Sequence, residues 1–127
     1  MNIDNYKTIE NNILIAEFMG AVISNKFVSF PDIKLDDNLG VISNNRSFND
    51  LHYNTSWDWL MKVVEQIERF ETVDVDILQY GTKIHNYKTG FEYVNNIANI
   101  SFDNKIEHTY NAVVDFIKNL KNNIQNF

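Results

Sequence analysis

The chain has 127 residues, a length typical of one domain with a single hydrophobic core. Seventeen acidic residues against eleven lysines and arginines give a formal net charge of −6, which argues against direct binding of nucleic acid, because phosphates require clustered basic residues. The absence of cysteine excludes disulfides, thiolate metal sites and cysteine nucleophiles.

Neither a signal peptide nor a membrane span is predicted. The first ten residues lack the basic and apolar pattern of a signal peptide, and no apolar run approaches the roughly 20 residues that cross a bilayer. We therefore expect a cytoplasmic protein with no membrane partner.

The first predicted helix runs from Asp4 to Met19. Ile9, Ile13 and Ala16 recur at helical spacing, and Gly20 stands where helices commonly end in a left-handed conformation. Two short apolar runs follow, at residues 21–23 and 27–30, and they are compatible either with a short hairpin or with an extended passage.

Regular periodicity fades between residues 32 and 53, which predicts a long loop. Such a loop is either functional or held by its own apolar residues, and we favour the second interpretation. Asp32, Asp36 and Asp37 lack the ligand spacing and closing Glu of a calcium loop. We expect no metal there.

The central predicted helix covers residues 55–70. Trp57, Leu60, Val64 and Ile67 recur at spacings of three and four, which indicates one buried face. Met61 and Val63 are expected to widen this face. Either Thr55 or Ser56 can cap the first turn.

The two tryptophans of this helix cannot share one face, because they are two residues apart. Trp57 is expected in the core and Trp59 at its edge. Trp59 is therefore either a contact residue for a partner or, as we prefer, a residue packed under a loop.

Residues 72–102 are predicted to form an antiparallel meander. Apolar and acidic residues alternate over 72–80, and residues 82–87 and 91–100 are the next strand candidates. A last helix is expected over residues 104–119, followed by a frayed tail over residues 122–127. The sequence thus predicts an α+β fold in one compact domain, residues 1–127, with three helices packed on an antiparallel sheet of about three to four strands.

Catalytic signatures are absent from the sequence. His52, His85 and His108 share no ligand spacing, and each is expected at the surface or its boundary. No serine lies in a nucleophile elbow, and the four glycines form no phosphate-binding loop. We therefore expect no enzyme, no cofactor and no metal site.

Acidic residues concentrate where the central helix passes into the sheet. Five acids within twelve residues, with Arg69 the only base among them, are either a solvated outer face or a surface that attracts a basic partner. Trp59 and the loop acids Asp36 and Asp37 complete the candidate contacts. The five acids are Glu65, Glu68, Glu71, Asp74 and Asp76.

Three blocks of the sequence resemble a group of small uncharacterised proteins of phages and prophages, especially in Bacteroidetes. They are residues 12–20 (NILIAEFMG), 51–61 (LHYNTSWDWLM) and 105–117, which contain KIE and YNAVVDFI. The chain is also similar to phage α-β-α sandwich domains. Most of the matching residues are core positions, so the resemblance implies a fold and an origin, and it implies no catalytic residue.

A small acidic phage-like protein without catalytic signatures is expected to act by binding a protein. The resemblance leads us to expect an inhibitor of a host defence system, such as a CRISPR effector nuclease, that binds a basic surface of its target. The alternative is a phage accessory protein without enzymatic activity that associates with itself as a homodimer.

Overall fold

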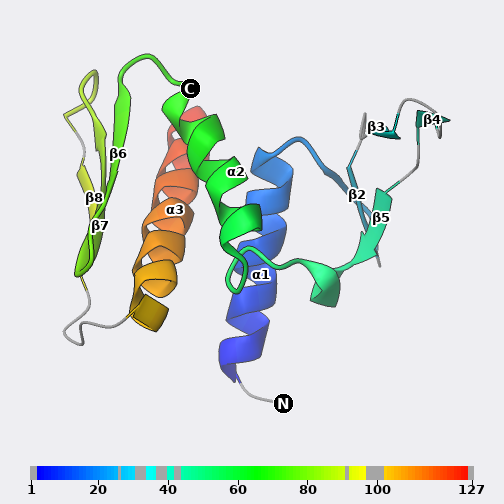
Figure 1. The fold of residues 1–127 in the computed structure, drawn as a ribbon. Helices are drawn as coiled ribbons and strands as arrows, with labels where there is room; N and C mark the ends of the chain where they lie inside the picture. The colour runs from blue at the N-terminus through cyan, green and yellow to red at the C-terminus, as the bar shows by residue number, and fades with distance from the viewer. Residues whose placement is uncertain are drawn as a thin grey trace. The chain divides into compact units, whose positions relative to one another are not determined.

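The computed structural model describes residues 3–25, 27–30, 34–36, 40–41, 44–90, 92–96 and 102–125. These residues form three α-helices and antiparallel sheets, which confirms the predicted α+β class (Figure 1). The chain divides into two compact units, Met1–Leu51 and His52–Phe127. That the two units form one domain stays a prediction.

The first unit begins with α1, Ile3–Phe18. The helix ends at Phe18, and Gly20 just after it has the predicted left-handed conformation, with a φ of +95°. Gly20 N–H donates to the Glu17 carbonyl (3.0 Å) and Ala21 N–H to the Ala16 carbonyl (3.0 Å), which together satisfy two of the last free carbonyls of the helix.

The buried side of α1 differs slightly from the predicted stripe. Ile15 and Ala16 are fully buried, and Asn12 is buried with them, whereas Ile9 and Ile13 are only half-buried. Asn12 tolerates burial because its amide donates to the Leu51 carbonyl (3.2 Å), and a buried polar group that is hydrogen-bonded costs little.

The hairpin alternative for residues 21–30 is the one observed. β1 (Val22–Ile23) pairs antiparallel with β2 (Phe27–Phe30). Ser24 closes the turn, because its hydroxyl donates to the Phe27 carbonyl (3.0 Å) and accepts from the Phe27 N–H (3.2 Å). Val28 is the buried residue of β2.

The prediction of an irregular segment between residues 32 and 53 is wrong for residues 34–36, 40–41 and 44–50, and it holds for residues 51–53. β3 (Lys34–Asp36) pairs with β4 (Gly40–Val41), β5 (Asn44–Ser47) pairs with β2, and a short 3-10 helix covers Phe48–Asp50. These strands are two to four residues long, too short to show a hydrophobic period.

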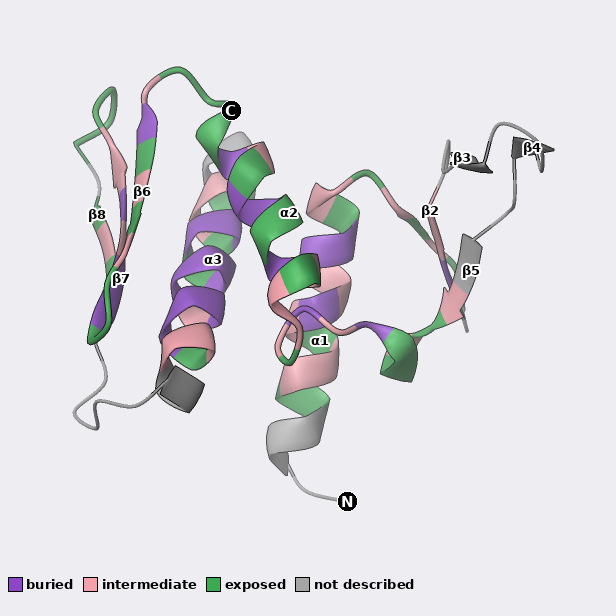
Figure 2. Cartoon of the chain, viewed as in Figure 1, coloured by how far each residue is buried: buried purple, intermediate pink, exposed green. Residues whose placement is uncertain are grey.

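The second unit begins with α2, Trp57–Glu68. Ser56, rather than Thr55, caps it, because its side chain accepts from the Trp59 N–H (3.4 Å). Four residues form its buried face, at the helical spacing that the sequence predicts (Figure 2). They are Leu60, Val63, Val64 and Ile67.

Trp57 and Met61 depart from their predicted places in the core. Trp57 is half-buried and Met61 is 36% exposed. Because each residue of a helix turns the chain by about 100°, Trp57 lies about 70° and Met61 about 110° from the centre of the buried face. The rim of that face therefore reaches Trp57 and excludes Met61.

The predicted meander is confirmed as a three-stranded antiparallel sheet. Its strands are β6 (Val73–Ile77), β7 (Gly81–Asn86) and β8 (Glu92–Asn96), in the order β6-β7-β8. α3, Phe102–Gln125, packs against β7 and β8, and α2 packs against β6 and α3. Residues 122–125, expected in a frayed tail, are the last turn of α3.

The core of this unit is formed between the helices and the inner face of the sheet. Phe116 of α3 makes T-shaped ring contacts with Phe70, which follows α2, and with Tyr93 of β8. The ring centroids are 6.1 Å and 5.5 Å apart, respectively. Burial raises the pKa of the Tyr110 hydroxyl well above its ordinary value. Besides the buried face of α2, the buried apolar residues described in this unit are Tyr53, Val73, Ile84, Tyr110, Ala112, Val113, Val114, Phe116 and Ile117.

Candidate functional site

The acidic, basic and histidine side chains of the three-stranded sheet all lie on one face. Asp74 pairs with His85, which pairs with Glu92, and Asp76 pairs with Lys83. Directly paired residues share a face of an antiparallel sheet. The alternate residues, such as Val75, Ile84 and Tyr93, lie on the opposite face, which α3 covers. We call the first set, Asp74, Asp76, Lys83, His85 and Glu92, the charged sheet face.

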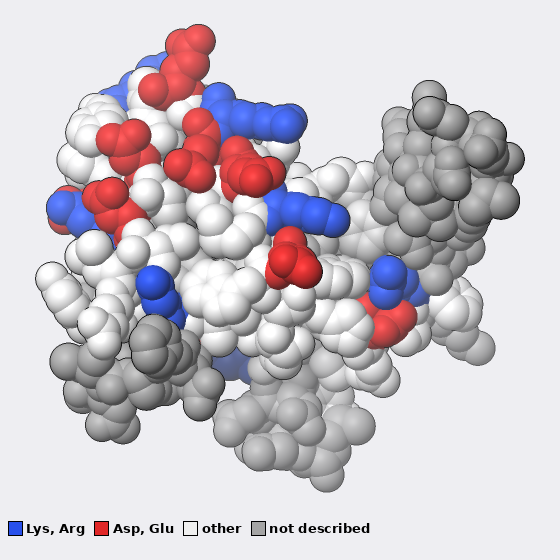
Figure 3. All heavy atoms as spheres, in the orientation of Figure 1, with Lys and Arg blue, Asp and Glu red and all other residues white. Residues whose placement is uncertain are grey.

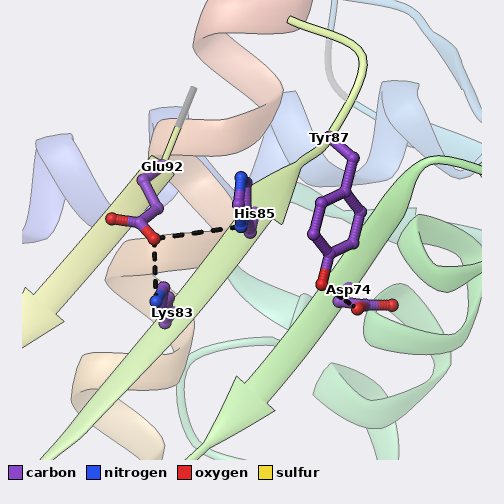
Figure 4. Close-up of polar contacts among 5 residues, drawn as sticks. All are labelled: Asp74, Lys83, His85, Tyr87 and Glu92. Carbon is purple, nitrogen blue, oxygen red and sulfur yellow. Dashed lines mark hydrogen bonds and ion pairs between the residues drawn. The ribbon is translucent and has the colours of Figure 1, made fainter. Parts of the chain in front are cut away.

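An ion pair crosses from β7 to β8 on this face (Figure 4). Lys83 Nζ lies 2.7 Å from Glu92 Oε1, and His85 Nδ1 lies 3.9 Å from the same oxygen. The hydrogen bond from Lys83 lowers the pKa of Glu92, and the same bond raises the pKa of Lys83. Both side chains are more than 40% exposed, so water screens the pair and its contribution to stability is small.

A second polar contact crosses from the end of β7 to β6. The Tyr87 hydroxyl donates to Asp74 Oδ2 (2.5 Å), and this hydrogen bond raises the pKa of the phenol. The Tyr87 ring also lies against the imidazole of His85, with centroids 4.4 Å apart (Figure 4). Tyr87 nevertheless stays 60% exposed, so one aromatic side chain is held in place while its surface remains open to a partner.

These contacts suit recognition better than catalysis. The side chains are exposed or half-buried, and their pairs are formed between neighbouring strands rather than around one reacting atom. Among the residues that the structure describes, no group of three or more His, Asp or Glu residues is placed to hold a metal ion. Tyrosine is enriched at protein-binding surfaces, whereas charged residues are concentrated at their polar rim.

All five acids predicted as partner contacts are exposed. Glu65 and Glu68 lie on the outer side of α2, and Glu71 lies in the turn to β6. Asp74 and Asp76 lie on the charged sheet face. Figure 3 shows acidic side chains gathered where α2 passes into β6, with basic side chains among them.

Basic residues interrupt these acids more than the sequence order indicates. Lys83 is distant from the five acids in the chain but sits directly opposite Asp76. Lys62 is exposed on α2, and Arg69 is exposed at the C-terminal cap of that helix. The five acids therefore belong to a surface of mixed charge with an acidic excess.

The other three predicted contact residues have separate outcomes. Trp59 is half-buried and makes T-shaped ring contacts with His52 (5.2 Å) and Tyr53 (5.1 Å) of the segment before α2. This is the packed arrangement that we preferred for it. Asp36 is the last residue of β3, in the first unit. Asp37 lies outside the described residues.

The prediction that His108 lies at the surface is wrong. His108 is fully buried, with Nδ1 2.6 Å from the Thr82 hydroxyl and Nε2 3.3 Å from the Gln79 carbonyl. Thr82 also lies 2.8 Å from the hydroxyl of Thr109, which donates to the Lys105 carbonyl (2.8 Å). The Gln79 carbonyl, between β6 and β7, and the Thr82 hydroxyl on β7 provide the hydrogen bonds that allow His108 to be buried on the inner side of α3.

Sequence reasoning overlooked Lys83, Tyr87 and Glu92 as site residues. Lys83 had a usable signal, because the sequence Thr82-Lys83-Ile84-His85 alternates in the manner of a strand with one polar face. Glu92 had none, since its pairing with Lys83 depends on the register between β7 and β8.

The fold and this surface define a small acidic α+β protein with a charged sheet face. No protein-family model, curated protein or solved structure matches the chain. No helix in the described part of the chain has the length and apolar character needed to cross a membrane.

Proposed function

We propose that the protein acts by binding another protein that has a basic surface, and that this partner is a host defence protein such as a CRISPR effector nuclease, which the binding inhibits. One observation carries the proposal: Glu65, Glu68, Glu71, Asp74 and Asp76 are all exposed. Their charges are available to an approaching partner.

Only part of this acidic charge is used within the protein. Asp74 accepts the Tyr87 hydroxyl, and Asp76 acts electrostatically on Lys83 and Tyr87. A surface with such an acidic excess speeds the approach of a basic partner and lowers the association rate of an acidic one. A nucleic-acid-binding groove is a basic surface of this kind.

The direct test measures inhibition of a purified guide-loaded effector nuclease by the native protein and by Glu65→Lys/Glu68→Lys/Glu71→Lys. The matched control is Glu10→Lys/Glu17→Lys/Glu107→Lys, which changes the net charge equally at three exposed acids elsewhere. We expect the first variant to lose inhibition and the control to retain it. Equal inhibition by both variants would remove these acids from the binding surface.

Replacing Lys83 should have the opposite effect on binding, because it makes the surface more acidic. Lys83→Gln removes the base beside Asp76 and frees Glu92 from its ion pair. A basic partner should then associate faster at low salt, and the gain should disappear as salt screens the charges. A slower association would show that Lys83 itself contacts an acidic group of the partner.

The first step towards the partner is capture by the tagged protein from lysate of a host with active defence systems. Recovery of a defence nuclease by the native protein and by the control, and not by the triple-lysine variant, supports the proposal. Recovery of only the protein itself favours the alternative, a self-associating accessory protein.

A further inference from the structure

β8 is an edge strand of the β6–β7–β8 sheet (Figure 1). β7 lies on one side of it, and none of the described strands lies on the other. A strand edge without a neighbour presents a row of backbone N–H and C=O groups, which can pair with another strand.

The hydrogen-bond pattern shows which residues present these groups. Leu78 N–H donates to the Gly81 carbonyl (2.8 Å), and Tyr87 N–H donates to the Thr72 carbonyl (2.7 Å). Alternate residues of an antiparallel strand direct their backbone groups to opposite sides. Residues 81, 83, 85 and 87 therefore bond to β6, and residues 82 and 84 bond to β8.

Thr82 and Ile84 are paired with Asn95 and Tyr93. Those two residues of β8 therefore direct their backbone groups towards β7. The backbone groups of Glu92, Val94 and Asn96 are directed to the free edge. At the centre of that edge, the Val94 side chain is 49% exposed.

This edge is complementary to a second copy of itself. Antiparallel pairing about Val94 places Val94 opposite Val94 of the other copy and Glu92 opposite Asn96, so every group directed to the free edge meets a partner. The strand carries one charged residue, Glu92. No antiparallel register that pairs at least two of Glu92, Val94 and Asn96 with a second β8 places Glu92 opposite another charge.

The other edge of the sheet, formed by β6, is not complementary to a second copy of itself. On β6, the residues directed away from β7 are Val73, Val75 and Ile77. Any antiparallel register that pairs at least two of them with a second β6 places Asp74 or Asp76 opposite an aspartate. Like charges in opposite positions disfavour pairing, which is a common way of protecting a strand edge.

We infer that two copies of the protein associate through β8, antiparallel and centred on Val94, and form a continuous sheet with three strands from each copy. The occupant of the free edge is a second copy, because the edge is self-complementary in hydrogen bonding and in charge. The charged sheet faces of the two copies then lie on the same side of the sheet, which doubles the surface offered to a partner.

Cysteine cross-linking tests the register directly, since the native chain has no cysteine. Residues opposite each other in a hydrogen-bonded pair have Cα atoms about 5.5 Å apart, within the range of a disulfide. We expect Val94→Cys to form a disulfide-linked dimer under mild oxidation. The matched control is Leu78→Cys, at an apolar residue of similar exposure, 46%, and cross-linking of Val94→Cys no faster than this control overturns the inference.

A charge exchange at the same position separates association from misfolding. Val94→Lys and Val94→Glu should each be monomeric in sedimentation at concentrations where the native protein is dimeric, because like charges then meet at the two-fold axis. An equimolar mixture should recover the dimer. A native protein that stays monomeric, or a mixture that stays monomeric beside a dimeric native protein, rejects pairing through β8.

Discussion

The imidazole Nδ1 of His108 lies 2.6 Å from the hydroxyl oxygen of Thr82, and both side chains are buried. The other ring nitrogen, Nε2, faces the Gln79 carbonyl (3.3 Å). Because a carbonyl can only accept, Nε2 carries a hydrogen towards Gln79, and Nδ1 and the Thr82 hydroxyl form the second hydrogen bond of the ring. This contact joins α3 to β7 through side chains that a purely apolar core would lack.

Thr82→Val should therefore destabilise the protein although it preserves shape. The valine leaves Nδ1 of His108 buried without its partner, and such a group costs about 1–3 kcal/mol. Chemical denaturation measures the loss, with Thr55→Val, at an exposed threonine before α2, as the control. Equal stability of the two variants would show that the His108 contact is energetically neutral.

The α2 helix offers a pair of neighbouring positions that differ in burial. Leu60→Ala removes a fully buried side chain and should cost about 2–5 kcal/mol, whereas Met61→Ala truncates a residue that is 36% exposed and should cost far less. Thermal and urea unfolding of the two variants measure the difference. Similar losses would mean that Met61 packs as tightly as Leu60.

The ion pair between Lys83 and Glu92 predicts that part of the protein's stability is lost at acidic pH. Lys83 lowers the pKa of Glu92 in the folded protein, so the contribution is present above the unfolded pKa and is lost as the pH falls through the lower folded pKa. Titration of the Glu92 carboxyl by NMR should give a value below that of an ordinary glutamate. Lys83→Met should return this value towards normal, and an unchanged value would exclude the ion pair as its cause.

The hydrogen bond between Tyr87 and Asp74 predicts that part of the protein's stability is lost at high pH. The hydrogen bond raises the pKa of Tyr87, so its contribution is present below the unfolded pKa and is lost as the pH rises through the folded pKa. Ultraviolet titration should show one tyrosine whose pKa falls in Asp74→Asn, because the carboxylate charge is removed. A titration curve unaltered by that substitution would argue against the bond in solution.

The helices were predictable because their signals are local. The spacing of Leu60, Val64 and Ile67 identifies the buried face of α2, and Gly20 marks the end of α1. The alternation in β6 likewise predicts which face of that strand is buried. β5 consists of four polar residues, so its sequence has no apolar alternation that would predict its pairing with β2.

The candidate site was predictable only in its acids. Exposure of Glu65, Glu68 and Glu71 follows from their positions on the polar side of α2 and in the turn after it. The base beside Asp76 and the phenol on Asp74 were not predictable, because Lys83 and Tyr87 reach these acids only through the register of β6 and β7.

The sequence by itself determined the periodic elements, the acidic excess and the exclusion of cysteine chemistry, since each of these depends on residues close together in the chain or on composition. The tertiary structure decided which distant residues meet: Lys83 with Glu92, Tyr87 with Asp74, and His108 with Thr82. A one-residue shift in strand register would reverse the face of every one of these strand side chains. Which residues meet on the surface therefore depends on long-range strand pairing, which the local sequence pattern does not determine.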